Sequence, residues 1–87
     1  MSDFMTEKEI EDLLVRETRS VEGAPHPVTA MRSLWVSLDC IQTMSNFTVR
    51  DIVGLTKMSM KEQGYSFTEA FEAVIAFTHR EIRNTQI

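Results

Sequence analysis

Few side chains in this sequence have the types and spacings that catalysis or metal binding requires. The available metal ligands are His26, His79, Cys40 and scattered carboxylates, and no HxxxH, ExxH or CxxC spacing joins them. Glu72 and His79 are seven residues apart on one side of a predicted helix, a spacing that fits a surface ion pair. Cys40 lies in the middle of a predicted helix, without the neighbouring cation or helix N-terminus that activates a thiol. We therefore expect no catalytic residue, no metal, no cofactor and no enzymatic activity.

The side chains best suited to binding an anion gather around residues 23–27. Guanidinium groups bind phosphate and carboxylate through paired hydrogen bonds. The candidates for such a site are Arg16, Arg19, His26 and Arg32. Glu17 and Glu22 are interleaved with them, and their carboxylates are alternative partners for the same arginines. The sequence leaves open whether this cluster binds a small anion or is paired within the chain.

A second basic feature is a stripe along one side of a predicted helix. Arg50, Lys57 and Lys61 are spaced i, i+7 and i+11, so they share nearly one helical angle over about 16 Å. Such a stripe fits either the phosphates of a nucleic acid or an ordinary solvated face. The net charge of −4 and the pI near 5.0 argue against a nucleic-acid-binding domain. Nucleic-acid, nucleotide or anion binding is therefore the alternative function and not the first one.

Two predicted helices, over residues 28–44 and 49–63, carry apolar side chains on both sides. A helix with this pattern is either enclosed within its own domain or shared with another chain. The candidate interface residues, which lie opposite the main apolar face of their helix, are Val36, Cys40, Met44, Leu55 and Met58. These residues are the reason to expect self-association.

Local signals for helix ends predict the elements that position these residues. Thr6, Thr48 and Ser66 each precede a carboxylate by three residues, which is the pattern of a capping box at a helix start. The middle box uses Asp51 in place of the usual Glu or Gln, and we expect it to be weaker for that reason. Gly64 suits the residue that ends a helix.

The fold class follows from these signals and from the apolar periodicity. The segment Gly23-Ala24-Pro25-His26-Pro27 disfavours helix and predicts a stiff connector. The sequence therefore predicts an all-α fold, a compact four-helix domain with helices over about 7–21, 28–44, 49–63 and 67–83.

Composition limits the class of protein. A chain of 87 residues fits one domain, 1–87, and its 43% apolar and 25% charged content is typical of folded globular proteins. One cysteine excludes an internal disulfide, and no run approaches the ~18 apolar residues of a membrane span. The first residues lack the apolar stretch of a secretory signal. We expect a cytoplasmic protein with no membrane association.

The negative charge is concentrated at the start of the chain. Residues 1–22 hold seven acidic and three basic residues, whereas residues 23–87 hold six of each. An acidic first helix and surplus apolar faces predict a small protein-interaction module, a regulator, adaptor or inhibitor of the kind found among phage accessory proteins. We expect a protein partner of unknown identity and a homodimer or higher homo-oligomer, and we do not expect nucleic acid to be the partner.

Overall fold

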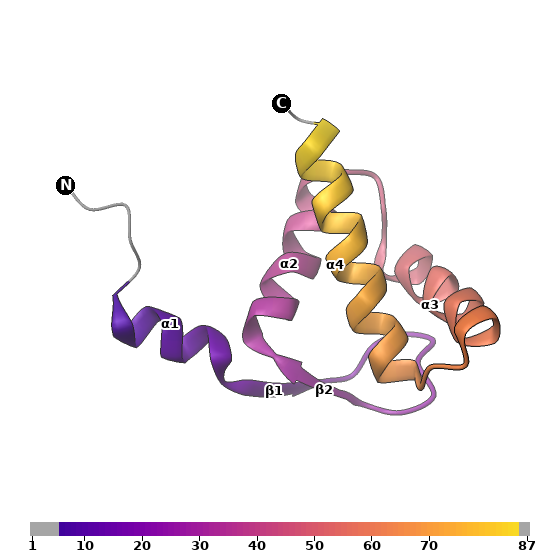
Figure 1. Cartoon of the computed structure of the whole chain (residues 1–87), viewed down its shortest axis with the longest axis horizontal. Coiled ribbons are helices and arrows are strands. Elements are labelled where there is room, and N and C mark those ends of the chain that lie inside the picture. Colours follow the sequence, from indigo (N-terminus) through magenta and orange to yellow (C-terminus); the bar gives the residue numbers. More distant parts are fainter. Residues whose placement is uncertain (1–5, 86–87) are drawn as a thin grey trace.

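The computed structural model describes residues 6–85, and within them it has four helices and one two-stranded antiparallel sheet. In chain order, the elements are α1 (Glu7–Leu14), β1 (Arg16–Arg19), β2 (Val28–Met31), α2 (Arg32–Met44), α3 (Val49–Gln63) and α4 (Phe67–Thr85). Helix α4 lies between α2 and α3, the hairpin crosses one end of these helices, and α1 projects to one side (Figure 1). The predicted helical fold class with four helices is confirmed, and the last helix runs two residues beyond its predicted end.

The starts of α3 and α4 confirm the capping predictions. The Thr48 hydroxyl accepts a hydrogen bond from the backbone N–H of Asp51 at 3.2 Å, and the Asp51 carboxylate accepts from the backbone N–H of Thr48 at 2.9 Å. Asp51, although shorter than the usual Glu or Gln, therefore closes a complete reciprocal box. The Ser66 hydroxyl accepts from the N–H of Glu69 at 3.3 Å. Gly64 ends α3 in the left-handed conformation, with φ of 73°.

The prediction of one continuous helix over residues 7–21 is wrong beyond the end of α1. There the chain forms β1, which pairs with β2 so that Arg16 is opposite Met31 and Thr18 is opposite Thr29. The two threonine hydroxyls are hydrogen-bonded across the strands at 2.6 Å. Cross-strand pairs between residues distant in sequence stabilise this segment, and helical periodicity does not reveal them.

The second predicted helix, over residues 28–44, begins only at Arg32 because its first residues form β2. Val28 and Ala30 alternate inward along this strand and are buried in the core, which a helix at this position would not achieve. The predicted connector is the loop of the hairpin. Gly23 allows this loop to turn, because its φ is 87°, a conformation that other residues rarely adopt.

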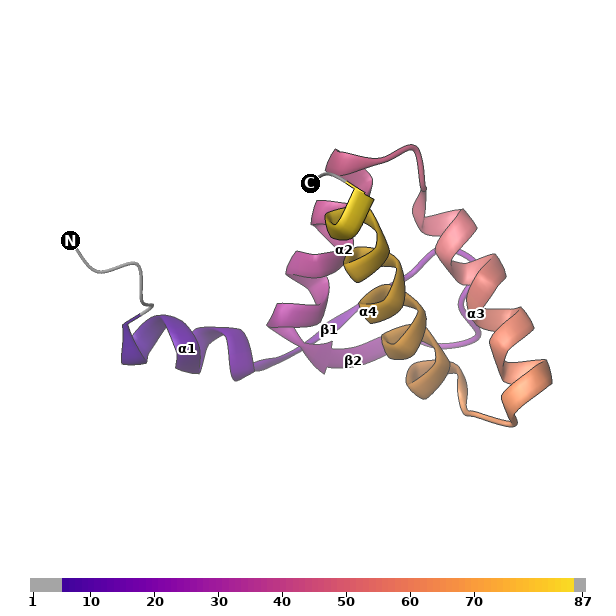
Figure 2. The ribbon, with the colours of Figure 1, turned by 45° about the horizontal axis from the view of Figure 1, so that its top comes forward.

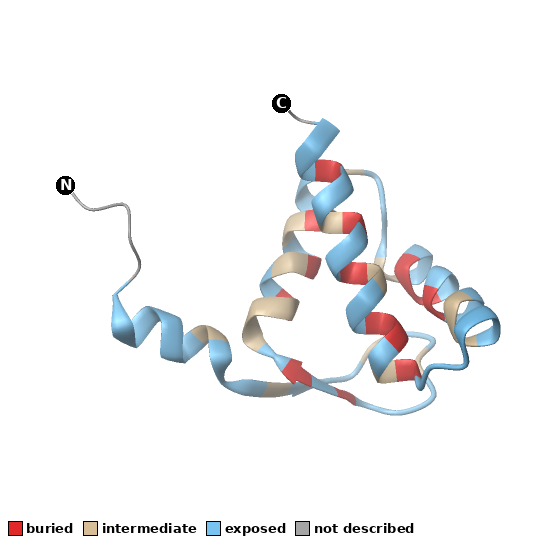
Figure 3. Ribbon diagram, in the orientation of Figure 1, coloured by how far each residue is buried: buried red, intermediate tan, exposed pale blue. Residues whose placement is uncertain are grey.

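The hydrophobic core lies where α2, α3, α4 and the hairpin meet. Trp35 and Phe71 are both fully buried, with ring centroids 6.0 Å apart, and Phe67 stacks on Phe71 at 5.6 Å. Thr56 is also fully buried, and its hydroxyl donates to the Ile52 carbonyl at 2.7 Å. Among the residues described, every buried side-chain nitrogen or oxygen has a hydrogen-bond partner. The buried residues lie on the facing sides of the three longer helices (Figure 3).

Helix α1 lies outside this core and has no buried residue (Figure 3). Thr6 caps it as predicted, because its hydroxyl accepts from the N–H of Glu9 at 3.2 Å. The predicted apolar side is present, but Ile10 is 46% and Leu14 58% exposed, and Leu13 is half-buried. The apolar face of α1 is therefore largely uncovered by the rest of the domain.

Candidate functional site

A groove of about 850 Å³ lies between α3 and α4. Five large apolar side chains in its lining are between 38% and 60% exposed: Phe47, Leu55, Met58, Tyr65 and Phe77. Two of them come from the helix α3, one from α4, and one from each of the segments that precede and follow α3. The half-buried or buried side chains of Val74, Thr78 and Ile82 also line it. We call this surface the α3–α4 groove.

The orientation of α3 explains why apolar side chains reach the groove. The core side of the helix is taken by Ile52, Val53 and Thr56, which are all buried. At 100° per residue, Leu55 and Met58 lie on a different side of the helix from these three. The same helix therefore has one apolar face in the core and a second one along the groove.

The structure brings the predicted interface residues Leu55 and Met58 together with aromatic side chains that sequence analysis did not single out. Tyr65 directly follows the glycine that ends α3, and Phe77 lies near the middle of α4. The sequence did contain a signal for Phe77. The core positions of α4 recur at helical spacing, at Phe67, Phe71, Ile75, Thr78 and Ile82, and Phe77 does not fall on that face.

The other predicted interface residues form a separate strip on α2. Val36 is 45% and Met44 39% exposed, and Cys40 is half-buried. The domain itself does not enclose this strip. Its coverage by another chain remains a prediction, and the strip is not part of the α3–α4 groove.

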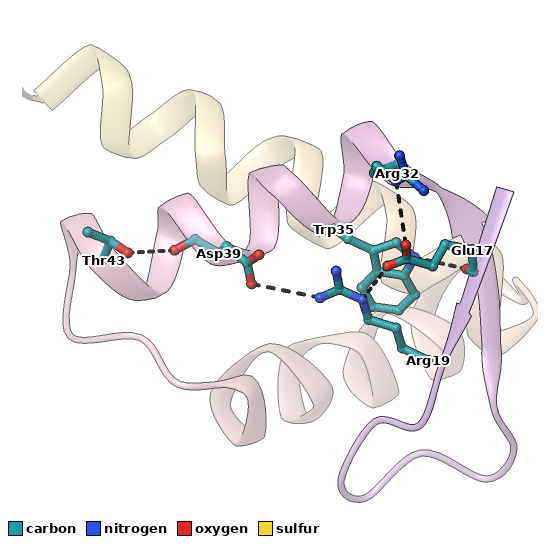
Figure 4. A network of polar contacts seen from close by, with 6 residues as sticks. All are labelled: Glu17, Arg19, Arg32, Trp35, Asp39 and Thr43. Carbon is teal, nitrogen blue, oxygen red and sulfur yellow. Dashed lines mark hydrogen bonds and ion pairs between the residues drawn. The ribbon is translucent and has the colours of Figure 1, made fainter. Parts of the chain in front are cut away.

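The arginines predicted as an anion site are partly paired with a carboxylate of the same chain (Figure 4). The Glu17 carboxylate lies 2.6 Å from Nε of Arg19 and 3.5 Å from Nε of Arg32. Arg19 also lies 4.0 Å from the Asp39 carboxylate, and its guanidinium carbon is 5.2 Å from the ring centroid of Trp35. The hydrogen bond from Arg19 holds the pKa of the Glu17 carboxyl below its usual value, and the positive charges of Arg19 and Arg32 act in the same direction.

The four predicted anion ligands do not converge on one point. Arg16 is on the opposite face of β1 from Glu17, because successive residues of a strand point to opposite sides. Nδ1 of His26 lies 2.8 Å from the carbonyl oxygen of the next residue. Only Arg19 and Arg32 come together, and Glu17 occupies the position between them that an anion would take. The cluster therefore joins the hairpin to α2.

The basic stripe of α3 lies on the surface, since Arg50, Lys57 and Lys61 are all exposed. Nη2 of Arg50 is 3.0 Å from the Glu22 carboxylate, and both side chains are more than 75% exposed. An ion pair this exposed contributes little to stability. One of the three cations nevertheless already has an acidic partner.

Two other kinds of feature are absent from residues 6–85. In this range no helix combines the length and apolar character needed to cross a bilayer, and no three ligand-type side chains cluster where they would hold a metal ion. No protein-family model, no curated protein and no solved structure matches this chain. Its function is therefore inferred from its own residues.

Proposed function

We propose that this protein is a small non-enzymatic interaction module, a regulator, adaptor or inhibitor, whose α3–α4 groove binds an amphipathic helix of another protein chain. The observation that supports the proposal is the gathering of five exposed apolar side chains in one groove. Contiguous exposed apolar surfaces rimmed by polar residues often mark binding sites for other proteins.

The shape and chemistry of the groove suit a helix. An amphipathic helix binds by placing apolar side chains at i, i+3, i+4 and i+7 in an apolar groove between two helices. Tyr65 and Phe77 are the natural anchors, because exposed aromatic side chains contribute most to binding when a partner buries them. Met58 adapts to partners of different shape through its flexible thioether. Burying one large apolar side chain contributes about 1.5–3 kcal/mol.

Charged residues beside the groove give such a helix an orientation. The guanidinium carbon of Arg80 lies 5.9 Å from the ring centroid of Phe77, within reach of a partner carboxylate at the edge of the groove. Glu62 and Glu81 line the groove itself. A polar rim of both signs around an apolar centre is the usual anatomy of a protein interface.

The experiment that tests this proposal is an NMR titration of the ¹⁵N-labelled protein with a synthetic amphipathic helical peptide that carries leucines at i, i+3, i+4 and i+7. We expect saturable shifts of the backbone amides that line the groove. Phe77→Glu should weaken binding at least ~10-fold, because it places a charge among apolar groups. The matched control is Val36→Glu, which changes a residue of similar exposure on α2, away from the groove.

A titration without saturable shifts in the groove at millimolar peptide would contradict the proposal. So would equal losses of affinity in Phe77→Glu and Val36→Glu, because the groove would then have no special part in binding. The alternative function, nucleic-acid or anion binding, has less support. Arg50 is paired with Glu22, Arg19 and Arg32 are paired with Glu17, and the chain has a net charge of −4.

A further inference from the structure

We infer that the helix that occupies the α3–α4 groove is α1 of a second copy of this chain. The inference rests on the proposed function, because it names the occupant of the same groove. Helix α1 carries the exposed apolar side chains that an apolar groove would bind. Ile10 and Leu14 are one helical turn apart and exposed, Leu13 is beside them, and no residue of α1 is buried.

The chain's own α1 cannot reach this groove. Only Val15 separates α1 from β1, and the Val15 carbonyl accepts a hydrogen bond from the backbone N–H of Arg32 at 2.8 Å. This short link holds α1 beside the start of α2. Both views place α1 at one end of the molecule and α3 at the other, with α2 and α4 between them (Figures 1 and 2). The groove must therefore be filled from outside.

Charge restricts how α1 can lie in the groove. Helix α1 holds four acidic residues and one basic residue, a net charge of −3, and the charged residues that line the groove, Glu62 and Glu81, are also acidic. The four basic residues in the same parts of α3 and α4 lie outside the lining: Lys57, Lys61, Arg80 and Arg83. The apolar side of α1 must therefore make the contact, with its acidic residues turned away from Glu62 and Glu81.

The length of α1 and the positions of α1 and α3 in the molecule also fit this arrangement. Eight helical residues span about 12 Å and the fifteen of α3 about 22 Å, so α1 is short enough to lie within the groove. The molecule measures 46 Å along its longest axis, and α1 and α3 lie towards its opposite ends (Figure 1). Two copies side by side in antiparallel orientation therefore bring each α1 to the other's α3–α4 end. This reciprocal exchange closes as a two-fold dimer with two equal contacts.

The test measures the mass of the full chain by light scattering and its dimer dissociation constant by sedimentation velocity. We expect a dimer for the wild type. Leu14→Glu and Phe77→Glu should each weaken dimerisation ~100-fold or more, because each charge enters an apolar contact that occurs twice. Both residues are more than half exposed, so the monomer should stay folded, which circular dichroism checks. Ile10→Glu is a second α1 variant with the same expected result.

Mixing the two variants identifies which surfaces meet. Leu14→Glu retains an intact groove and Phe77→Glu retains an intact α1, so a mixed dimer of the two keeps one unaltered contact. The mixed dimer should therefore be tighter than the dimer of either variant alone. In an α1-to-α1 contact, Phe77→Glu alone would still dimerise. If two grooves contacted each other, Leu14→Glu alone would still dimerise. Either result would overturn the inference.

Val36→Glu separates this inference from the strip on α2, and it should leave the dimer intact. Loss of the dimer in Val36→Glu, with Leu14→Glu still dimeric, would assign self-association to α2 and overturn the inference. A monomeric wild type whose groove binds the leucine peptide would overturn the inference alone. A monomeric wild type that does not bind the peptide would overturn the proposed function too.

Discussion

The indole N–H of Trp35 donates a hydrogen bond to the backbone carbonyl of Glu17, at 3.0 Å, and joins β1 to α2 (Figure 4). The two residues are 18 positions apart. The indole ring is fully buried against Phe71, while the carboxylate of Glu17 pairs with arginines at the surface. This pair of residues thus connects the hairpin both to the hydrophobic core and to the surface ion pairs of Glu17 with Arg19 and Arg32.

Trp35→Phe should lower the free energy of unfolding by about 1–3 kcal/mol, because the Glu17 carbonyl loses its donor and the core loses volume. Urea unfolding followed by far-ultraviolet circular dichroism measures this change. Phe77→Leu is the control, since it alters an exposed side chain and should shift the free energy by less than ~0.5 kcal/mol. Equal stabilities of wild type and Trp35→Phe would contradict the role given to the hydrogen bond.

The Glu17 pairs should make part of the stability depend on pH. The folded-state pKa of Glu17 is lowered from its ordinary value of 4.5, so folding favours the ionised form. This stabilisation is complete above pH 4.5 and is lost as the pH falls below that value through the lower folded-state pKa.

Glu17→Gln removes the titrating group and tests this dependence. We expect the variant to be less stable than wild type at about pH 7, and we expect the difference to shrink towards about pH 3. Urea midpoints at the two pH values measure it, and Glu72→Gln serves as a control outside the network. A difference that grows as the pH falls would have the wrong sign.

The helix caps should differ in their effect on global stability. Thr48→Ala removes the acceptor of a complete capping box on a helix that packs into the core, and we expect a cost of about 1–2 kcal/mol. Thr6→Ala removes the cap of α1, which has no buried residue, so only local order of α1 should fall. Urea unfolding reports the first effect and amide hydrogen exchange the second. A global loss in Thr6→Ala equal to that in Thr48→Ala would show that α1 is coupled to the core.

The basic stripe on α3 should not bind nucleic acid at physiological salt. Three cations are few beside the ~6–10 phosphate contacts of well-studied duplex-binding proteins, and a net charge of −4 opposes a polyanion. Gel shifts with duplex and single-stranded DNA at micromolar protein measure this. A salt-sensitive shift that disappears when Arg50, Lys57 and Lys61 are all replaced by Gln would establish the alternative function.

The sequence by itself determined the ends of α3 and the start of α4. The caps at Thr48 and Ser66 act through hydrogen bonds that span three residues, and Gly64 through its own backbone conformation. Because these interactions join residues that are close in sequence, the residue types and their spacing are sufficient to predict them. The apolar periodicity of α3 also identified Leu55 and Met58 as members of a second face.

Only the tertiary structure decided the hairpin and the composition of the groove. Helical periodicity extends to Val21, yet residues 16–19 pair with a strand nine to fifteen positions further on, because this pairing places Val28 and Ala30 in the buried core that also holds Trp35. The gain comes from contacts between distant residues, which outweigh a weak local preference for helix. For the same reason Tyr65, Phe77 and Leu55 line one groove only when α3 and α4 pack together. The position of Phe77 off the core face of α4 was readable from the sequence, but no local pattern indicated that the three residues share a groove.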